Sequence, residues 1–133
     1  ELVSAIYQTA QFQPALERMR TELMPRGIHL FGHGHQHVNH DSLGYAAALA
    51  SFRLNYALME GWGLQPRAYA YPGSAGRNRS TQLACQQAGF ICARGSTVSP
   101  DSFYICPDSV LAPKNWYYLP AVVMAPVIGS SGR

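Results

Sequence analysis

Short apolar segments alternate with helical patterns along most of this chain, and this alternation constrains its fold most strongly. Each apolar segment is bounded by glycine or proline, as β-strands usually are. The expected elements, in chain order, are a helix from Pro14 that stops at Pro25 and Gly27, a strand over 28–31, a helix with Tyr45, Leu49, Phe52, Tyr56 and Met59 on one face, a strand over 67–71, a helix through Gln87 and a strand over 90–93. Such alternation is typical of a parallel α/β sheet or barrel.

The helix starts carry recognisable capping signals. Asp41 or Ser42 is expected to cap the long second helix, and Ser80 or Thr81 the short third one. After Gly95 the pattern is looser, and strand-like pieces are expected at 103–106 and 116–124.

Composition narrows the class of protein. Hydrophobic residues make up 47% of the 133 residues, which suits one domain spanning 1–133 with a proper core, and the start at Glu1 favours a processed or truncated product. Charged residues make up 13% and the net charge is +3, with Lys114 the only lysine, which is too weak and scattered to imply nucleic-acid binding. Pro120 and Pro126 interrupt the longest apolar tract, so no stretch reaches the length of a membrane span.

The three cysteines, Cys85, Cys92 and Cys106, are spaced seven and fourteen residues apart, so no pair has a zinc-knuckle or redox spacing. We expect them to be small buried hydrophobic side chains. One disulfide with one free thiol is the alternative.

All five histidines fall within twelve positions, at His29, His33, His35, His37 and His40. A neutral imidazole is a good ligand for zinc, nickel, cobalt or iron near neutral pH. Adjacent imidazoles repel each other when protonated and need partners when buried, so packing explains this crowding poorly. The cluster therefore predicts a metal site, and a solvated polar loop that binds metal only adventitiously is the alternative.

The spacing does not decide which histidines are the ligands, because the answer depends on the backbone conformation of the segment. His33 and His37 would share one face of a helix or meet across a turn, and Gly32 and Gly34 argue against a regular helix. An extended segment would instead place His33, His35 and His37 on one face, so His35 competes as a ligand. A catalytic metal usually keeps three protein ligands and one open position for water, so a third ligand is needed.

The flanking residues are expected to support this site. His40 and Asp41 fit capping and hydrogen bonding to a ligand imidazole, and His29 fits an ordinary strand residue. Ligands of parallel α/β folds bind beyond the carboxyl ends of the strands. Both the histidine segment and the turn Tyr71-Pro72-Gly73 follow expected strands, so we expect them to meet at one rim of the sheet.

Three motifs occur in order along the chain: Gly32-His33-Gly34-His35-Gln36-His37, then Arg67-Ala68-Tyr69-Ala70-Tyr71-Pro72-Gly73, then Ala88-Gly89-Phe90. In this order they resemble the polysaccharide deacetylases of carbohydrate esterase family four. The resemblance covers roughly residues 16–124. It implies part of a (β/α) barrel-like domain with parallel strands, incomplete at its N-terminus.

The resemblance also implies roles for particular residues. His33 and His37 match the two histidines of the family's His-(Ser/Thr)-x-x-His metal motif. The Gly73 N–H would donate to the oxyanion, and Tyr71 and Pro72 would line the substrate groove, although Tyr71 fits a core strand aromatic equally well. The implied cofactor is a divalent metal, zinc first and cobalt or nickel as alternatives, and the implied partner is an N-acetylated glycan.

The chain departs from the family pattern in three places. Gly34 stands where serine or threonine is commoner. The family's opening Thr-Phe-Asp-Asp-Gly strand, which supplies the catalytic base and the third metal ligand, is absent. Its late Leu-x-His motif, which supplies the general acid, is also absent because no histidine follows His40. Asp41 is the only nearby carboxylate, and helix capping explains it better than a role as base.

Three functions therefore compete. The first is a metal-dependent hydrolase that removes N-acetyl groups from a sugar polymer, which the resemblance favours together with a secreted or cell-envelope location. The second is a non-catalytic relative that binds carbohydrate on the same rim, and the third is a metal-binding or scaffold domain. A barrel that lacks a strand would expose a sheet edge, so self-association stays open.

Overall fold

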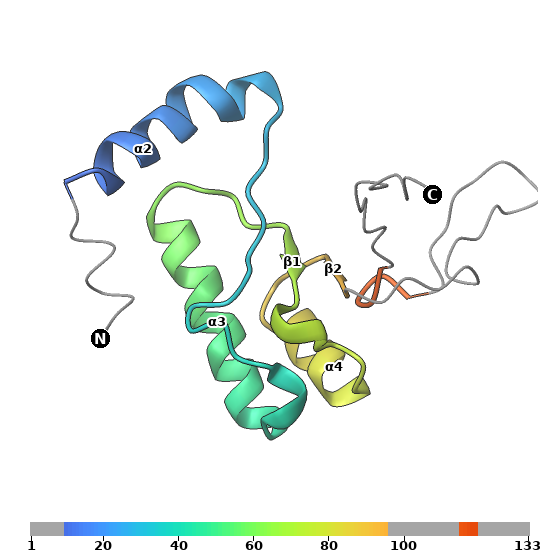
Figure 1. Ribbon diagram of the computed structural model, residues 1–133. Coiled ribbons are helices and arrows are strands. Elements are labelled where there is room, and N and C mark those ends of the chain that lie inside the picture. Colours follow the sequence, from blue (N-terminus) through green and yellow to red (C-terminus); the bar gives the residue numbers. More distant parts are fainter. Residues whose placement is uncertain (1–9, 96–114, 120–133) are drawn as a thin grey trace, which may run out of the picture.

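The computed structural model describes residues 10–95 and 115–119, and Figure 1 shows their arrangement. In chain order the elements are α2 (Phe12–Arg18), the π-helical turn η1 (Met19–Leu23), the 3-10 turns η2 (Met24–Arg26) and η3 (His40–Ser42), α3 (Tyr45–Gly61), β1 (Ala68–Ala70), the 3-10 turn η4 (Pro72–Ser74), α4 (Arg79–Gln87) and β2 (Cys92–Arg94). The order of helices and strands from α3 to β2 is the predicted one. The expected strand piece at 103–106 and the end of the one at 116–124 lie outside the described residues. The described start of the second piece is wrong as a strand, because it forms a turn in which Leu119 makes an isolated bridge.

β1 and β2 form a small parallel sheet in which Ala68, Tyr69 and Ala70 lie opposite Cys92, Ala93 and Arg94. One bridge extends the sheet on each side, because Gly32 pairs with Tyr69 and Leu119 pairs with Arg94, both in parallel. The parallel mixed α/β class is therefore confirmed. The described sheet is too small to show a barrel.

The predicted strand over 28–31 is wrong, because only Gly32, just after it, pairs with β1. The segment leaves Ile28, Leu30 and Phe31 exposed by 46%, 37% and 57%. Within the described ranges no strand lies on the outer side of this segment to pair with it. His29 is likewise exposed and outside any strand.

The first helix ends where predicted and starts earlier. It begins at Phe12, two residues before Pro14, continues through η1 and η2, and stops at Gly27, whose φ of +83° suits glycine.

The predicted caps of the other two helices are wrong. Gly44 precedes α3 with extended backbone, and Asn78 precedes α4, so the helices start near the expected residues with different caps.

Aromatic residues of α3, of β1 and of the segments that flank the strands form the core. Figure 1 shows how α3 and α4 lie beside the two strands. Phe52 of α3 is fully buried, with its ring centroid 4.9 Å from that of Tyr69 in an edge-to-face contact. The ring centroids of Tyr69 and Phe90 lie 5.0 Å apart in a tilted contact. Edge-to-face pairs of this kind contribute beyond the area that they bury.

A smaller cluster joins α2 to the far end of α3. Leu16, Met59 and Leu64 are its buried members, and Phe12 packs edge-on against Trp62 with ring centroids 5.2 Å apart. No helix among the described residues is both long and apolar enough to span a membrane.

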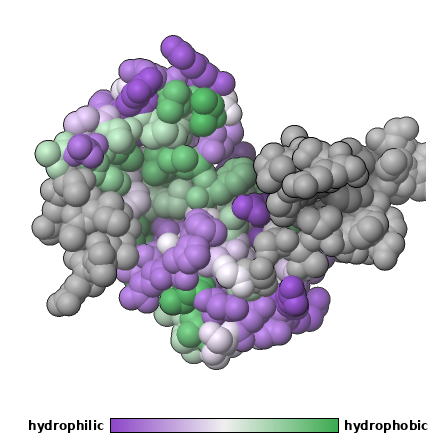
Figure 2. Space-filling view, in the orientation of Figure 1, coloured by the Kyte–Doolittle hydropathy of each residue, from purple (hydrophilic) through white to green (hydrophobic). Residues whose placement is uncertain are grey.

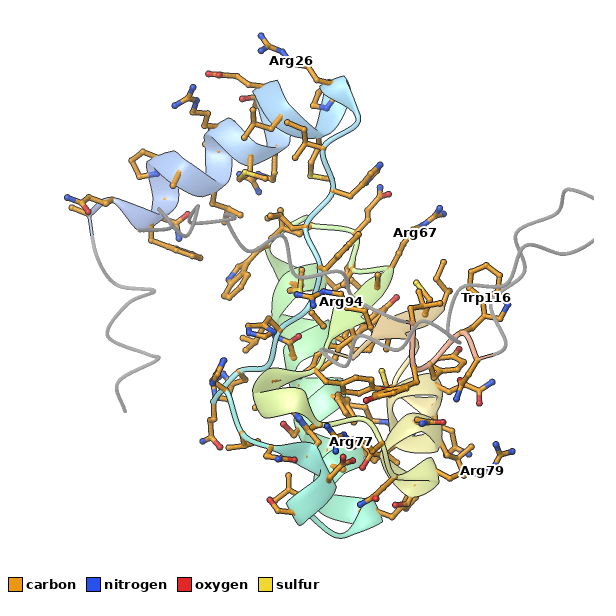
Figure 3. All side chains as sticks on the ribbon, turned by 45° about the vertical axis from the view of Figure 1, so that its right-hand side comes forward. Arg26, Arg67, Arg77, Arg79, Arg94 and Trp116 are labelled. Carbon is orange, nitrogen blue, oxygen red and sulfur yellow. The ribbon has the colours of Figure 1, made fainter. Side chains whose placement is uncertain are left out.

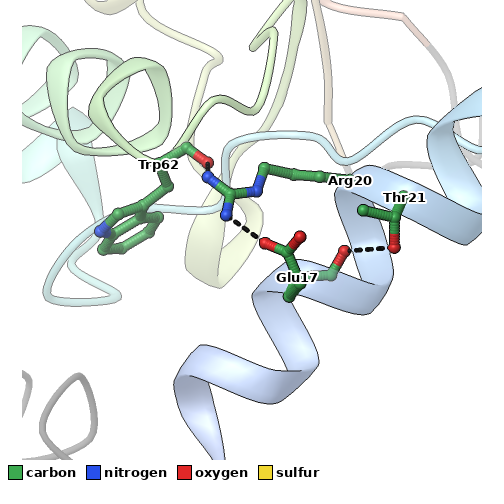
Figure 4. Close-up of polar contacts among 4 residues, drawn as sticks. All are labelled: Glu17, Arg20, Thr21 and Trp62. Carbon is green, nitrogen blue, oxygen red and sulfur yellow. Dashed lines mark hydrogen bonds and ion pairs between the residues drawn. The ribbon is translucent and has the colours of Figure 1, made fainter.

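Polar contacts fix η1 against the end of α3, as Figure 4 shows. The Arg20 guanidinium donates to the Trp62 carbonyl oxygen at 3.4 Å and pairs with the Glu17 carboxylate. Thr21 Oγ1 donates to the Glu17 carbonyl oxygen at 2.9 Å. These groups are exposed, so they orient the helix more than they stabilise it.

Gly32 is a position at which a single methyl group should disturb the fold. A β-carbon there would lie 2.5 Å from Asn55 Oδ1 and 2.8 Å from Tyr69 Cδ2. We expect Gly32→Ala to lower the free energy of unfolding by about 1–3 kcal/mol through overpacking. Urea unfolding followed by circular dichroism would measure it.

Gly61→Ala is the matched control for this substitution. Gly61 is the last residue of α3 and has no atom within 4 Å of an added β-carbon. The same change should there be neutral or stabilise by up to about 1 kcal/mol, since alanine favours helix. Equal effects at the two positions would contradict the packing argument.

Candidate metal centre

The backbone pairing at Gly32 places His33 at the end of β1. Gly32 N–H donates to Ala68 O at 2.9 Å, and Ala70 N–H donates to Gly32 O at 2.7 Å. The next acceptor along the strand, Ala70 O, lies 2.9 Å from His33 Nδ1. A carbonyl oxygen only accepts, so Nδ1 of His33 carries a proton, and in the neutral ring Nε2 is the nitrogen with the lone pair. Metal-binding histidines are usually held in this way.

A tight turn then brings His37 back to His33. Gly34 has a φ of +90°, and His37 itself has a φ of +52°, which few residues other than glycine adopt. The two imidazole centroids lie 4.9 Å apart with their planes at 73°. The segment is therefore a turn rather than a helix or a strand, and the extended frame with three histidines on one face does not occur.

His35 occupies the middle of the turn. It is half-buried, and its Nδ1 has no hydrogen-bond partner among the described residues. His33 and His37 remain the two histidines that the turn brings ring to ring.

Gly34 is a glycine for a packing reason as well. A β-carbon at this position would lie 3.0 Å from Tyr69 Oη and 3.2 Å from Pro72 Cγ, and it would have to adopt the positive φ. The serine or threonine commoner in the resembled family would be strained here.

The pair fits two positions of a metal's ligand set. Two imidazoles are a common part of zinc sites, in which three protein ligands leave one position for water. Within residues 10–95 and 115–119, no three histidine, cysteine, aspartate or glutamate side chains lie close enough together to hold an ion. The described residues thus bring two candidate ligands together, His33 and His37, without a third beside them.

His40 belongs to the core, and its predicted capping and support of a ligand imidazole are wrong. It is fully buried and stacks on Phe52 with ring centroids 4.2 Å apart, and its Nε2 lies 3.1 Å from Ser51 Oγ. Burial lowers the pKa of His40 from 6.5 to about 4, although the nearby Asp41 carboxylate opposes the shift. His40 is therefore neutral at physiological pH.

Asp41 anchors the loop before α4 instead of capping α3. Its carboxylate accepts from the backbone N–H groups of Arg77 at 2.9 Å and Asn78 at 3.3 Å, and its carbonyl oxygen accepts from Asn78 Nδ2 at 3.1 Å. Burial raises the pKa of Asp41, but hydrogen bonds from Thr81 and these amides outweigh it and lower the pKa. An ionised carboxylate engaged in this way is a poor general base.

The histidine segment and the Tyr71-Pro72-Gly73 turn meet at one rim, as predicted. Pro72 lies against Gly34, and Asn39 Nδ2 donates to Gly73 O at 3.4 Å. Gly73, at a φ of +58°, is exposed, whereas Tyr71 and Pro72 are buried.

Tyr71 therefore follows the second of its two predicted interpretations, the core strand aromatic. It is 4% exposed, and its hydroxyl donates to Tyr117 O at 3.0 Å. Pro72 is also too buried to present a wall to a ligand at this rim. Of the three turn residues, Gly73 is the one accessible from outside.

The prediction of buried cysteine side chains is confirmed for Cys85 and is wrong for Cys92. Cys85 and Cys92 are unpaired, the first buried and the second half-buried, and Cys106 lies outside the described residues. Burial raises the pKa of the Cys85 thiol to about 12, which makes it a poor nucleophile.

Positive charge is spread over the described part of the molecule. Figure 3 shows Arg26 at one end of it and Arg79 at the opposite end, with Arg67 between them. These arginines come from η2, from α4 and from the segment before β1, so they do not form one patch beside the histidines.

His40 makes stability depend on pH in a defined window. Its pKa is lower in the folded chain, about 4, than the ordinary 6.5, so the unfolded chain binds the proton more readily. Stability should be full above pH 6.5 and fall as the pH drops toward 4, with a slope approaching about 1.4 kcal/mol per pH unit. Urea unfolding at a series of pH values, with chelator present, would measure this slope.

His40→Gln should flatten the slope in this window, whatever its effect on stability at neutral pH. His29→Gln, at an exposed position, is the control and should keep it. The pKa of Asp41 is lowered from its ordinary value of 3.8, so Asp41 should change the stability only below that pH, outside the window. An unchanged slope in His40→Gln would assign the pH dependence to other groups.

Comparison with known proteins adds no relative to this geometry. No protein-family model matches the chain, and no curated protein and no solved structure matches it.

Proposed function

We propose that this chain is part of a metal-dependent hydrolase that removes N-acetyl groups from a glycan, with His33 and His37 as two of the metal ligands. One observation carries the proposal. The His33 and His37 rings lie together, and the Ala70 carbonyl fixes the His33 tautomer so that Nε2 is available. A satisfied partner on the other ring nitrogen is what a metal-binding imidazole requires.

The metal, when bound, would lower the pKa of a water molecule and polarise the acetyl carbonyl. The chain's own residues supply orientation. Ala70 O holds one ligand ring, and Asn39 holds the Gly73 carbonyl, which keeps the exposed Gly73 beside the histidine turn. In this proposal the Gly73 N–H donates to the oxyanion. A general base and a third ligand would have to come from outside the described residues.

The larger barrel is also a proposal, and the edges of the sheet support it. Each outer segment, at Gly32 and at Leu119, makes a single bridge. Ile28, Leu30 and Phe31 are exposed beside the first bridge, where a neighbouring strand would cover them. A parallel sheet normally has both of its faces covered by other parts of the protein.

One observation favours a second candidate, a metal-binding relative without catalysis. Asp41, the carboxylate closest in sequence to the histidines, is committed to the amides of Arg77 and Asn78. If no other carboxylate completes the site, the chain would hold an ion or a glycan without hydrolysing it.

Zinc binding by the full chain tests the pair directly. Calorimetry on untagged, chelator-treated protein should give one zinc site that His33→Ala and His37→Ala each weaken by about tenfold or more. His29→Ala, at an exposed histidine of the same cluster, is the matched control and should leave the affinity unchanged. Equal zinc affinity in the wild type and in these three variants would contradict the assignment. Loss of zinc binding in His35→Ala, with binding retained in the other variants, would instead assign the site to His35.

Acetate release from N-acetylglucosamine oligomers separates the two candidate functions. A hydrolase should release acetate in the presence of zinc and lose this activity in His37→Ala. Zinc binding without acetate release at any zinc concentration would identify the non-catalytic relative. Circular dichroism of His37→Ala would show that its loss is chemical, since His37 is exposed and outside the core.

A further inference from the structure

The segment 29–33 is an open edge of the sheet. Gly32 uses both of its backbone groups on β1, since its N–H donates to a β1 carbonyl and its own carbonyl accepts from a β1 amide. Along an extended strand, successive residues direct these groups to opposite sides, so those of His29, Phe31 and His33 point away from β1. These outward groups have no backbone partner among the described residues.

The side chains of the same three residues share one face. A β-carbon added to Gly32 would point into the core. Side chains alternate along a strand, so Phe31 and His33 on either side of it point to the opposite face, and continued alternation places His29 there as well. Both histidines are exposed, and Phe31 is 57% exposed.

Space lies beside this edge. Phe31 and His33 line an apolar groove that the segment forms with α2 and α3. Figure 2 shows hydrophobic residues gathered in a band across the molecule, with hydrophilic residues above and below. An exposed strand edge with apolar side chains is a template for pairing with another chain.

The order of residues along this edge is self-complementary about Phe31. His29 lies two residues before Phe31, and His33 lies two residues after it. When two copies of the segment pair antiparallel with Phe31 on the twofold axis, His33 of each copy therefore lies opposite His29 of the other. All three residues point their backbone groups outward, so each opposing pair exchanges two hydrogen bonds.

This pairing supplies the ligand that the histidine pair lacks. Within the described ranges His33 and His37 have no third metal-binding side chain beside them, and His29 of the same chain does not complete the group. Opposing side chains of an antiparallel pair have β-carbons about 4.5–5.5 Å apart, so the two imidazoles can reach one ion. Three histidines with one open position are a common catalytic zinc site.

We propose that two copies of this chain pair along 29–33 and form two metal centres, each built from His33 and His37 of one copy and His29 of the other. The inference rests on the proposed function and names the source of its third ligand. The neighbouring strand beside Phe31 is then the same segment of the second copy. Such a twofold contact is self-complementary and closed, as in most homodimers.

Zinc-dependent association of the full, untagged chain tests this interface. Sedimentation velocity should show monomers in chelator and dimers with one zinc per chain after zinc is added, with dimerisation at least tenfold tighter. A chain that binds zinc at His33 and His37 and stays monomeric when saturated would overturn this inference alone. A wild-type chain that binds no zinc would overturn the proposed function, and this inference with it.

His29→Ala separates the interface from the ligand pair. In a dilute monomer His29 does not belong to the site, so this variant should keep the zinc affinity of the wild type there. At higher protein concentration in zinc it should dimerise at least tenfold more weakly. His35→Ala, a histidine of the same cluster outside the paired segment, is the matched control and should dimerise like the wild type. Zinc-dependent dimers that persist in His29→Ala would overturn the inference.

A mixture of His29→Ala and His33→Ala chains tests whether the ligands come from two copies. Neither variant can build a complete site with itself. A mixed dimer joins His33 and His37 of the first variant to His29 of the second, which restores one site. The mixture should regain zinc-dependent dimers with one zinc per dimer, and a mixture that stays as monomeric as its two components would overturn the inference.

Phe31→Cys tests the register of the pairing. The residue on the axis faces its own copy, and Cα atoms of a hydrogen-bonded antiparallel pair lie about 5.5 Å apart, which suits a disulfide. Mild oxidation in zinc should therefore link Phe31→Cys chains into covalent dimers. Leu30→Cys is the matched control, since Leu30 is also exposed but lies off the axis and on the other face. Linkage of Leu30→Cys without linkage of Phe31→Cys would overturn the proposed register.

Discussion

The close approach of Gly32 to β1 is the contact on which the rest of the structure depends. With no side chain at this position, the segment packs between Asn55, Tyr69 and Phe90 and completes two backbone hydrogen bonds with β1. The same pairing delivers His33 to the Ala70 carbonyl one step further along. The aromatic core and the histidine pair therefore both depend on this contact, and each would shift if the segment moved outward.

Sequence patterns predicted the elements that follow from the spacing of their own apolar residues. The long helix follows from the spacing of Phe52 and Met59, and β1 and β2 from short apolar runs between turns. The parallel pairing of these strands and the meeting of the histidine segment with the turn at Pro72 and Gly73 followed from general rules on α/β folds. These rules describe how chains connect, so they hold without knowledge of particular contacts.

The errors arose where a distant residue decides the outcome. Asp41 lies beside α3 in sequence but bonds to amides thirty-six and thirty-seven residues away, so a local capping rule could not place it. In sequence His40 belongs to the histidine cluster, but in the fold its ring stacks on Phe52 in the core.

The exposed apolar residues before Gly32 fit the proposal of a larger sheet. In an extended segment alternate side chains point to the same side, so Phe31 and His33 share a face while Gly32 turns to the core. A segment that packed only within the described residues would bury Phe31, whose side chain is 57% exposed. A neighbouring strand that covered Phe31 would also lie beside His33, where the proposed metal site needs its third ligand.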